Sequence, residues 1–119
     1  MYEYKARLVR VIDGGTIDAD IDMGFQVHID QRIKLFGVNA PDPKSHDTEE
    51  RERGLASKNR LIEILPKEII VQTMLNKRGK FGRIIGIVMY KEEHGEIVNV
   101  NDLIISEGFA TRYPSNEDK

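Results

Sequence analysis

Hydrophobic and polar residues alternate along the first third of the chain, which is the pattern of strands that bury one face. Tyr4–Ile12 alternates with one change of phase, so we expect a strand with a bulge near Leu8 and Val9. Thr16–Ile21 alternates without interruption, and Phe25–Phe36 is expected to form one long strand. Because short turns join these segments, the pattern predicts a meander of three strands.

The middle of the chain changes to a helical period. We predict that Thr48–Leu65 forms a helix that begins with Thr48 as its N-cap and ends before Pro66. Acidic residues in its first turn suit the positive end of the helix dipole. Residues at helical spacing predict its buried face, which would consist of Leu55, Asn59, Ile62 and Leu65, with Leu61 beside them.

Two more strands and a short helix complete the pattern. The strands are predicted at Glu68–Met74 and Gly82–Tyr90, with the basic loop Leu75–Phe81 between them. A short helix capped by Asn101 is expected to run through Glu107. Five strands with a helix between the third and the fourth predict a mainly β (α+β) fold, a five-stranded OB-fold barrel with two helices.

Size and composition fit one small domain. The 119 residues are 39% hydrophobic and 32% charged, which is typical of a soluble globular protein with a charged surface. We expect one domain over residues 1–114 and a polar, disordered tail over 115–119. No apolar run approaches the roughly 20 residues that cross a membrane, and no signal peptide is evident, so we expect a cytoplasmic protein.

Charge and side-chain chemistry narrow the choice of partners. Without cysteine, disulfides and thiolate metal sites are excluded. The histidines are scattered without ligand spacing, which disfavours a zinc site. The net charge of −2 argues weakly against a protein that wraps nucleic acid by bulk electrostatics. A local basic face remains open, because four cations fall within seven residues: Lys77, Arg78, Lys80 and Arg83.

Three polar residues in turns could support phosphodiester chemistry. Asp13 lies in the first turn, and Asn39 and Asp42 follow the third strand around a proline. The two turns can converge in a small barrel, where carboxylates could hold a hard cation. A purely structural role in turns is the commoner use of such residues. The guanidinium of Arg83 is suited to bind a phosphate at two points, although a lone arginine on a strand usually faces solvent.

Four motifs in register resemble the staphylococcal nuclease (thermonuclease) family over nearly the whole chain, from about Tyr4 to Tyr113. They are Val11–Thr16, Ile33–Asp42, Lys80–Arg83, and Val100–Ile104 with Gly108–Ala110. The resemblance implies an OB-fold barrel with helices and the calcium-dependent cleavage of DNA and RNA. It ends near Tyr113, so the last long helix of the family is expected to be truncated or absent.

The resemblance also assigns roles to individual positions. The catalytic positions it implies are Lys34, Asp42 and Arg83. The implied substrate-binding positions are Lys80, Phe81 and Tyr113. The implied metal-binding positions are Asp13, Asn39 and Ala40, with Thr16 as a supporting residue.

This chain departs from the family pattern at four of those positions. Gly15 stands where the family has a calcium-binding aspartate, and Asn39 replaces a second one. Asp42 is one methylene shorter than the expected glutamate, and Lys34 replaces an arginine that can make a two-point phosphate contact. Calcium affinity follows ligand charge, so these changes predict weak calcium binding and weak or absent hydrolysis.

Three functions remain open at this point. The first is a protein, expected to be a monomer, that binds single-stranded DNA or RNA through the basic positions and cleaves it poorly. The second is an active metal-dependent endonuclease in which Asp13, Asp42 and either Asp18 or Asp20 rebuild the cation site. The third is a protein-interaction module on the same barrel, which the acidic net charge allows.

Overall fold

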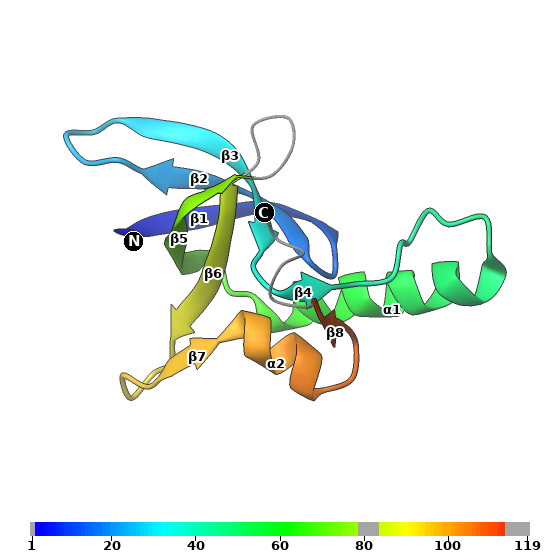
Figure 1. The fold of residues 1–119 in the computed structure, drawn as a ribbon. Helices are drawn as coiled ribbons and strands as arrows, with labels where there is room; N and C mark the ends of the chain where they lie inside the picture. The colour runs from blue at the N-terminus through cyan, green and yellow to red at the C-terminus, as the bar shows by residue number, and fades with distance from the viewer. Residues whose placement is uncertain (1, 79–83, 114–119) are drawn as a thin grey trace.

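A barrel of five strands forms the body of the molecule (Figure 1). The fold is that of a computed structural model, which describes residues 2–78 and 84–113. The barrel strands are β1 (Tyr2–Asp13), β2 (Thr16–Asp22), β3 (His28–Leu35), β5 (Glu68–Arg78) and β6 (Ile84–Lys91). The predicted OB-type barrel with two helices is therefore confirmed. The predicted tail, 115–119, lies outside the described residues.

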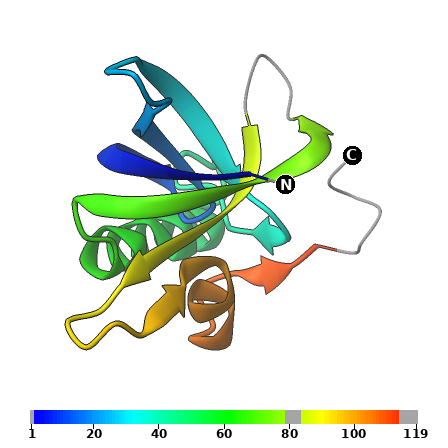
Figure 2. The same cartoon turned by 90° about the vertical axis from the view of Figure 1, so that its left-hand side faces the viewer.

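The barrel closes because β3 contacts two strands that are far apart in the sequence. β3 pairs antiparallel with β2 over His28–Lys34 and parallel with β6 over Ile33–Leu35. β1 joins β2 to β5, and β7 (Ile97–Asn99) extends the sheet beyond β6. Figure 2 shows the strands curving around a common interior, with both helices on the same side of the barrel.

The alternating pattern predicted the strands β1 and β2 correctly. Ile17, Ala19 and Ile21 are buried, and the aspartates between them point outward. The register of β1 on β2 shifts between Leu8 and Arg10, which confirms the predicted bulge. The bulge adds one residue to β1 and increases the local twist that a small barrel needs.

The third strand is shorter than predicted. Gly24–Val27 forms a turn rather than part of the strand, since Phe25 and Gln26 have φ angles of 54° and 63°. The amide of Val27 donates to the carbonyl of Gly24, and the amide of Met23 donates to the carbonyl of Val27. The alternation of apolar residues through Phe25 therefore does not reflect burial. It belongs to an exposed hairpin tip.

The helix α1 (Thr48–Ile64) buries Leu61 as expected, and Leu65 just after it is buried too, but the rest of its buried face consists of small residues and not of the predicted apolar ones. Its buried residues are Gly54, Ser57 and Leu61, whereas Leu55 and Ile62 are 44% and 50% exposed. Close packing decides this orientation, because large side chains do not fit between the helix and the neighbouring loops. The predicted N-cap is also wrong by one residue, since the side chain of Asp47 accepts from the amide of Glu49.

The second half of the chain differs from the prediction mainly at element ends. β5 continues to Arg78, so the predicted basic loop begins later than Leu75, and residues 79–83 lie outside the described ones. The helix α2 (Val100–Ser106) is capped by Asn99 and not by Asn101. A small second sheet pairs β4 (Val38–Asn39) with β8 (Thr111–Arg112). No helix in the described part of the chain is long and apolar enough to span a membrane.

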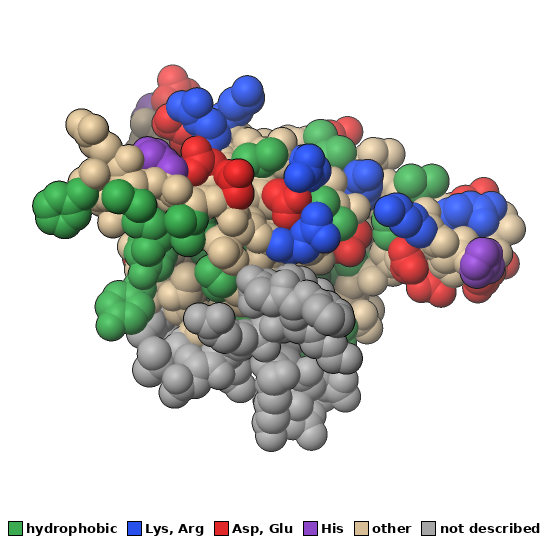
Figure 3. Space-filling model, turned by 90° about the horizontal axis from the view of Figure 1, so that it is seen from above, with side chains coloured by type: hydrophobic (Ala, Val, Ile, Leu, Met, Phe, Trp, Pro, Cys, Tyr) green, Lys and Arg blue, Asp and Glu red, His purple; other side chains and the backbone are tan. Residues whose placement is uncertain are grey.

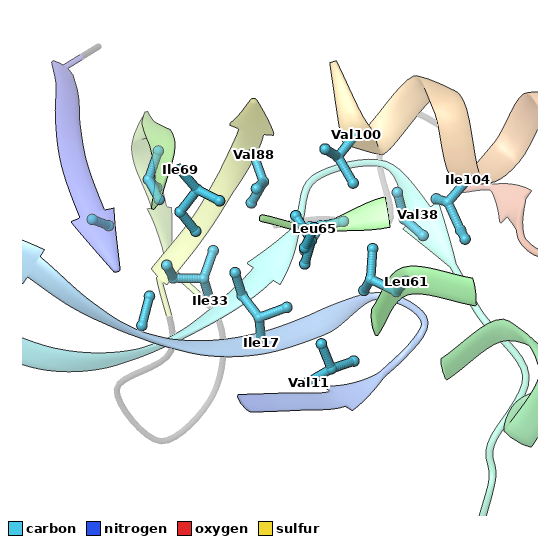
Figure 4. Packing of buried hydrophobic residues seen from close by; sticks show 14 of the residues in the cluster. Val11, Ile17, Ile33, Val38, Leu61, Leu65, Ile69, Val88, Val100 and Ile104 are labelled. Carbon is cyan, nitrogen blue, oxygen red and sulfur yellow. The ribbon is translucent and has the colours of Figure 1, made fainter. Parts of the chain in front are cut away.

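One hydrophobic core joins the barrel to both helices. Ile17 and Ile33 reach it from the barrel, Leu61 from α1, and Val100 and Ile104 from α2 (Figure 4). All five side chains are fully buried. Because the same core holds the strand ends and the helices, the loops between them are fixed relative to one another. This arrangement positions the corner of the barrel described below.

The contact between Gly14 and Ser57 generates a prediction. A Cβ on Gly14 would lie 1.7 Å from Ser57 Oγ and 2.8 Å from Ser57 Cβ. We expect Gly14→Ala to lower the free energy of unfolding by about 1–3 kcal/mol, as overpacking does. Ser57→Gly should relieve the clash, so the double variant should be more stable than the sum of the two single effects predicts.

Urea unfolding of the two single variants and the double variant measures this coupling. Strictly additive effects would contradict the packing described here. Ser57→Ala serves as a control, because Ser57 Oγ is buried without a hydrogen-bond partner among the described residues. Removing that hydroxyl should leave stability unchanged or raise it slightly.

Candidate nucleic-acid interface at a corner of the barrel

Three segments meet at one corner: the turn between β1 and β2, the chain leaving β4, and the middle of α1. A Cβ on Gly15 would lie 3.3 Å from Val38 Cγ1 and 3.7 Å from Ala40 Cβ. A Cβ on Gly54 would lie 2.4 Å from the backbone nitrogen of Pro43. Glycine at these places lets the backbones approach closely. The expected convergence of the two turns is therefore present in the fold.

The candidate metal positions offer little negative charge. Asp13 is half-buried, and its Oδ1 accepts from the amide of Gly15 at 2.8 Å, which closes the turn. Asn39 is exposed and pairs with Thr111 in the small sheet. Its backbone carbonyl accepts from Thr111 Oγ1 at 3.3 Å. Of these two candidate side chains, one is thus a partly engaged carboxylate and the other is a neutral amide.

Lys34 is held at the same corner, next to Tyr113. Its Nζ donates to the carbonyl oxygens of Val38 and of Leu35, the latter at 3.0 Å. The same Nζ lies 4.7 Å from the centre of the Tyr113 ring, a cation–π distance. Tyr113 is fixed in turn by its amide, which donates to the carbonyl of Gly37 at 2.9 Å. Sequence positions 79 residues apart thus form a cation beside an aromatic face.

Asp42 forms hydrogen bonds that stabilise the loop in which it lies. It is exposed, and its Oδ1 accepts from the amide of Lys44 at 2.8 Å. Its backbone amide donates to Glu50 on α1 at 3.4 Å. These bonds shape the turn after Pro41 and engage one oxygen of the carboxylate. The other catalytic position, Arg83, and the substrate positions Lys80 and Phe81 lie outside the described residues.

The carboxylate of Asp18 forms ion pairs with two arginines. Its Oδ2 accepts from Arg10 Nε and its Oδ1 from Arg32 Nε, both at 2.8 Å. The Arg32 hydrogen bond, followed by that of Arg10, holds the pKa of Asp18 below its ordinary value, against the opposing effect of burial. Asp20 lies 3.4 Å from His28 Nδ1. In the described ranges neither aspartate joins Asp13 in a group of side chains close enough to hold a metal ion, so the alternative in which they complete a cation site gains no support.

A groove of about 510 Å³ opens beside the corner. Asn39, Ala40 and Pro41 line one side, and the segment from Phe109 to Thr111 lines the other. Glu50 and Arg53 border it from α1. The groove brings apolar and polar groups together, and it runs along the small sheet of β4 and β8 through Asn39 and Thr111.

Sequence reasoning gave the wrong role to Asn101, which holds this corner to the barrel and was expected to be a helix cap. The side chain of Asn101 is buried and donates to the carbonyls of Phe36 and Gly86 at 3.0 and 3.1 Å. It also accepts from the amide of Val88 at 3.0 Å. These bonds fix the chain between β3 and β4 against β6. The only sequence signal was an asparagine among apolar residues, which is equally typical of a helix cap.

A comparison with protein families decides the relationship. The family described as staphylococcal nuclease homologue matches residues 32–119. The chain belongs to that family. A comparison with curated proteins found no match. The matched range includes Lys34, Val38–Asp42 and Tyr113. It begins after the Asp13–Thr16 turn, so the match does not cover Gly15.

A calcium ion does not suit the donors at this corner. Calcium is held by six to eight oxygen atoms, and its affinity rises with the number of carboxylates. Gly15 supplies no side-chain oxygen, Asn39 supplies a neutral one, and Asp13 already closes its turn. No three His, Asp or Glu side chains in the described ranges gather closely enough to hold a metal ion.

Replacing both missing carboxylates should create calcium affinity. Gly15 is not among the glycines with positive φ, and its Cβ position is only tight against Val38, so aspartate fits after a small shift. We expect Gly15→Asp with Asn39→Asp to bind Ca²⁺ at least about tenfold more tightly than the natural sequence, because two charged ligands are added. Calorimetric titration measures this difference.

The matched control is Gly15→Asn, which adds a side chain of nearly the same size without a charge. It should bind Ca²⁺ no better than the natural sequence. If the natural sequence already bound Ca²⁺ as tightly as the double variant, the description of the corner as charge-poor would be wrong.

Proposed function

We propose that this protein binds single-stranded nucleic acid at the corner of the barrel and cleaves it weakly or not at all. The observation that carries the proposal is the pair formed by Lys34 and Tyr113. An ammonium group beside an aromatic ring offers a phosphate contact and a stacking surface at one place. The family of nucleases to which the chain belongs supports the choice of nucleic acid.

The hydrogen bonds of Lys34 favour binding over catalysis. Two of its partners, the carbonyls of Val38 and Leu35, are neutral, so these two hydrogen bonds hold the ammonium in place without cancelling its charge. A lysine fixed in this way can attract a phosphate as a point charge. It cannot make the planar two-point contact through which an arginine stabilises a phosphoryl group in the transition state.

The hydrogen bonds of Asp42 and the donor set at the turn support low hydrolytic activity. A general base must reach the water that it activates, and Asp42 is both short and engaged with the amide of Lys44. Misplacement of a catalytic group by about 1 Å can cost about a hundredfold in rate. Because Gly15 and Asn39 supply no carboxylate, a metal ion that could polarise the phosphate would be held weakly.

Binding should depend on salt through Lys34. We expect a fluorescent single-stranded DNA oligonucleotide to bind with an affinity that falls as salt rises, because bound phosphates release counterions. Lys34→Gln should reduce the slope of log K against log salt by about 0.7, the value for one phosphate contact on a single strand. Fluorescence anisotropy at several salt concentrations measures both quantities.

Two comparisons make this measurement specific. Tyr113→Ala should weaken binding by about 1–3 kcal/mol through lost stacking and leave the slope unchanged, whereas Tyr113→Phe should bind normally. Lys67→Ala removes an exposed charge just beyond the far end of α1 and should change neither quantity. Equal effects of Lys34→Gln and Lys67→Ala would show that binding does not use this corner.

Cleavage assays test the second half of the proposal. With Ca²⁺ or Mn²⁺, the natural sequence should degrade single-stranded DNA no faster than Arg83→Ala. The fourfold variant Gly15→Asp, Asn39→Asp, Lys34→Arg and Asp42→Glu should be faster than both, because it restores the cation ligands and the two-point phosphate contact. Efficient cleavage by the natural sequence that Arg83→Ala abolishes would instead identify an active endonuclease.

A further inference from the structure

One aspartate holds two arginines on the outer face of the barrel. Arg10 on β1 and Arg32 on β3 flank Asp18 on β2, and the register places all three in one row across the strands. The side chain of Asp18 is only 13% exposed, whereas those of Arg10 and Arg32 are 65% and 48% exposed. This row, named the arginine clamp, therefore carries two accessible positive charges and one largely covered negative charge. Figure 3 looks down on the face that contains β2 and β3 and shows lysine and arginine side chains interleaved with acidic ones.

The hydrogen bonds of the arginine clamp leave donors for a second anion. Arg32 donates to Asp18 through Nε at 2.8 Å and Nη2 at 3.1 Å, and Arg10 donates through Nε at 2.8 Å. Among the described residues, Nη1 of Arg32 and both Nη atoms of Arg10 have no hydrogen-bond partner. A guanidinium has five N–H donors, so both arginines can bind a phosphate while Asp18 holds them in place. Side chains that are already fixed lose less entropy on binding.

The arginine clamp adjoins the corner that holds Lys34. Arg32 and Lys34 are two residues apart on β3, so their side chains leave the same face about 7 Å apart. The hydrogen bond and the charge of Asp18 raise the pKa of Arg32, and Asp13 adds a smaller effect in the same direction. Arg32 therefore lies within electrostatic reach of the turn at the corner. Lys34, Arg32 and Arg10 form a path of cations that leads from the corner across the strands.

Beyond the arginine clamp the positive charges are balanced. In the next row Asp30 lies opposite Asp20, and Arg7 lies between Asp20 and Glu68. The hollow beside this row is lined by three cations and three acids: Lys5, Arg7, Lys91, Asp20, Asp22 and Glu68. A phosphate therefore gains a net attraction at the arginine clamp and none one row farther from the corner.

We propose that the arginine clamp binds the phosphates that follow the one held at Lys34, so that a single strand runs from the corner across β3 and β2 toward β1. The inference rests on the proposed function, because it extends the same surface along the nucleic acid. Arg10 and Arg32 stand on strands about 10 Å apart, so each takes its own phosphate. Their guanidinium groups can contact phosphate oxygens at two points. Contacts to phosphates add affinity without a preference for base sequence.

Oligonucleotides of two lengths separate the arginine clamp from the corner. A thymidine dinucleotide carries a single phosphate, whereas a thymidine hexanucleotide carries enough phosphates to reach from Lys34 to Arg10. In an NMR titration of the ¹⁵N-labelled protein, both ligands should shift amide signals at the corner. Only the hexanucleotide should also shift the signals of residues 10, 18 and 32.

Substitutions in the arginine clamp measure its contribution. For the hexanucleotide, Arg32→Gln and Arg10→Gln should each reduce the slope of log K against log salt by about 0.7, the value for one phosphate on a single strand. At 0.1 M salt this corresponds to about fivefold weaker binding. Neither variant should change the affinity for the dinucleotide. The matched control is Arg7→Gln, which removes an exposed arginine of β1 from the balanced row and should leave both quantities unchanged.

Lysine variants keep the test independent of folding. Arg32→Lys and Arg10→Lys retain the charge, so the slope should return to that of the natural sequence. The inference is overturned if the slope stays low in the lysine variants, or if the glutamine variants lower it no more than Arg7→Gln does. In either case the proposed function stands as long as Lys34→Gln still lowers the slope. If Lys34→Gln has no effect on either oligonucleotide, the proposed function itself fails.

Discussion

The close approach of α1 to the barrel is the constraint on which the candidate site depends. Gly14 packs against Ser57, and Gly54 packs against the backbone at Asp42 and Pro43. Larger side chains at these places would force the helix away from the turn between β1 and β2 and from the chain that leaves β4. Small residues therefore hold α1 against the loops at this corner. In the core, large residues such as Leu61, Val100 and Ile104 hold the helices against the barrel. The family resemblance assigns roles to individual residues, but the packing of α1 against the barrel determines where those residues lie.

Much of the barrel could be predicted, since alternation at period two marks strands with one buried face. Thr16–Ile21 fits that rule, and the bulge near Leu8 follows from a change of phase. The same rule failed at Phe25, because exposed apolar residues at a hairpin tip continue the alternation without being buried. It failed for α1 as well. Because α1 packs through Gly54 and Ser57 as well as Leu61, it leaves Leu55 and Ile62 outside, and hydrophobic spacing alone then indicates the wrong face.

The candidate site was predictable as a set of positions and not as a set of contacts. The motifs around Asp13 and Asn39 indicated two turns that could meet, and the barrel brings them together. Sequence could not show that Lys34 lies over the Tyr113 ring, because that contact depends on the pairing of β4 with β8. Nor could it show that Asp42 closes its own turn. These contacts are why we describe the corner as a binding surface with little negative charge for a cation.

Chemical-shift mapping with a single-stranded oligonucleotide, in the presence of Ca²⁺ and again after its removal, tests this account most directly. We predict shifts in the turn at residues 13–16, in the chain at 38–42 and at 111–113, with the same affinity under both conditions. The oligonucleotide should be recovered intact. Binding that requires Ca²⁺, shifts that avoid this corner, or rapid cleavage of the oligonucleotide would contradict the account.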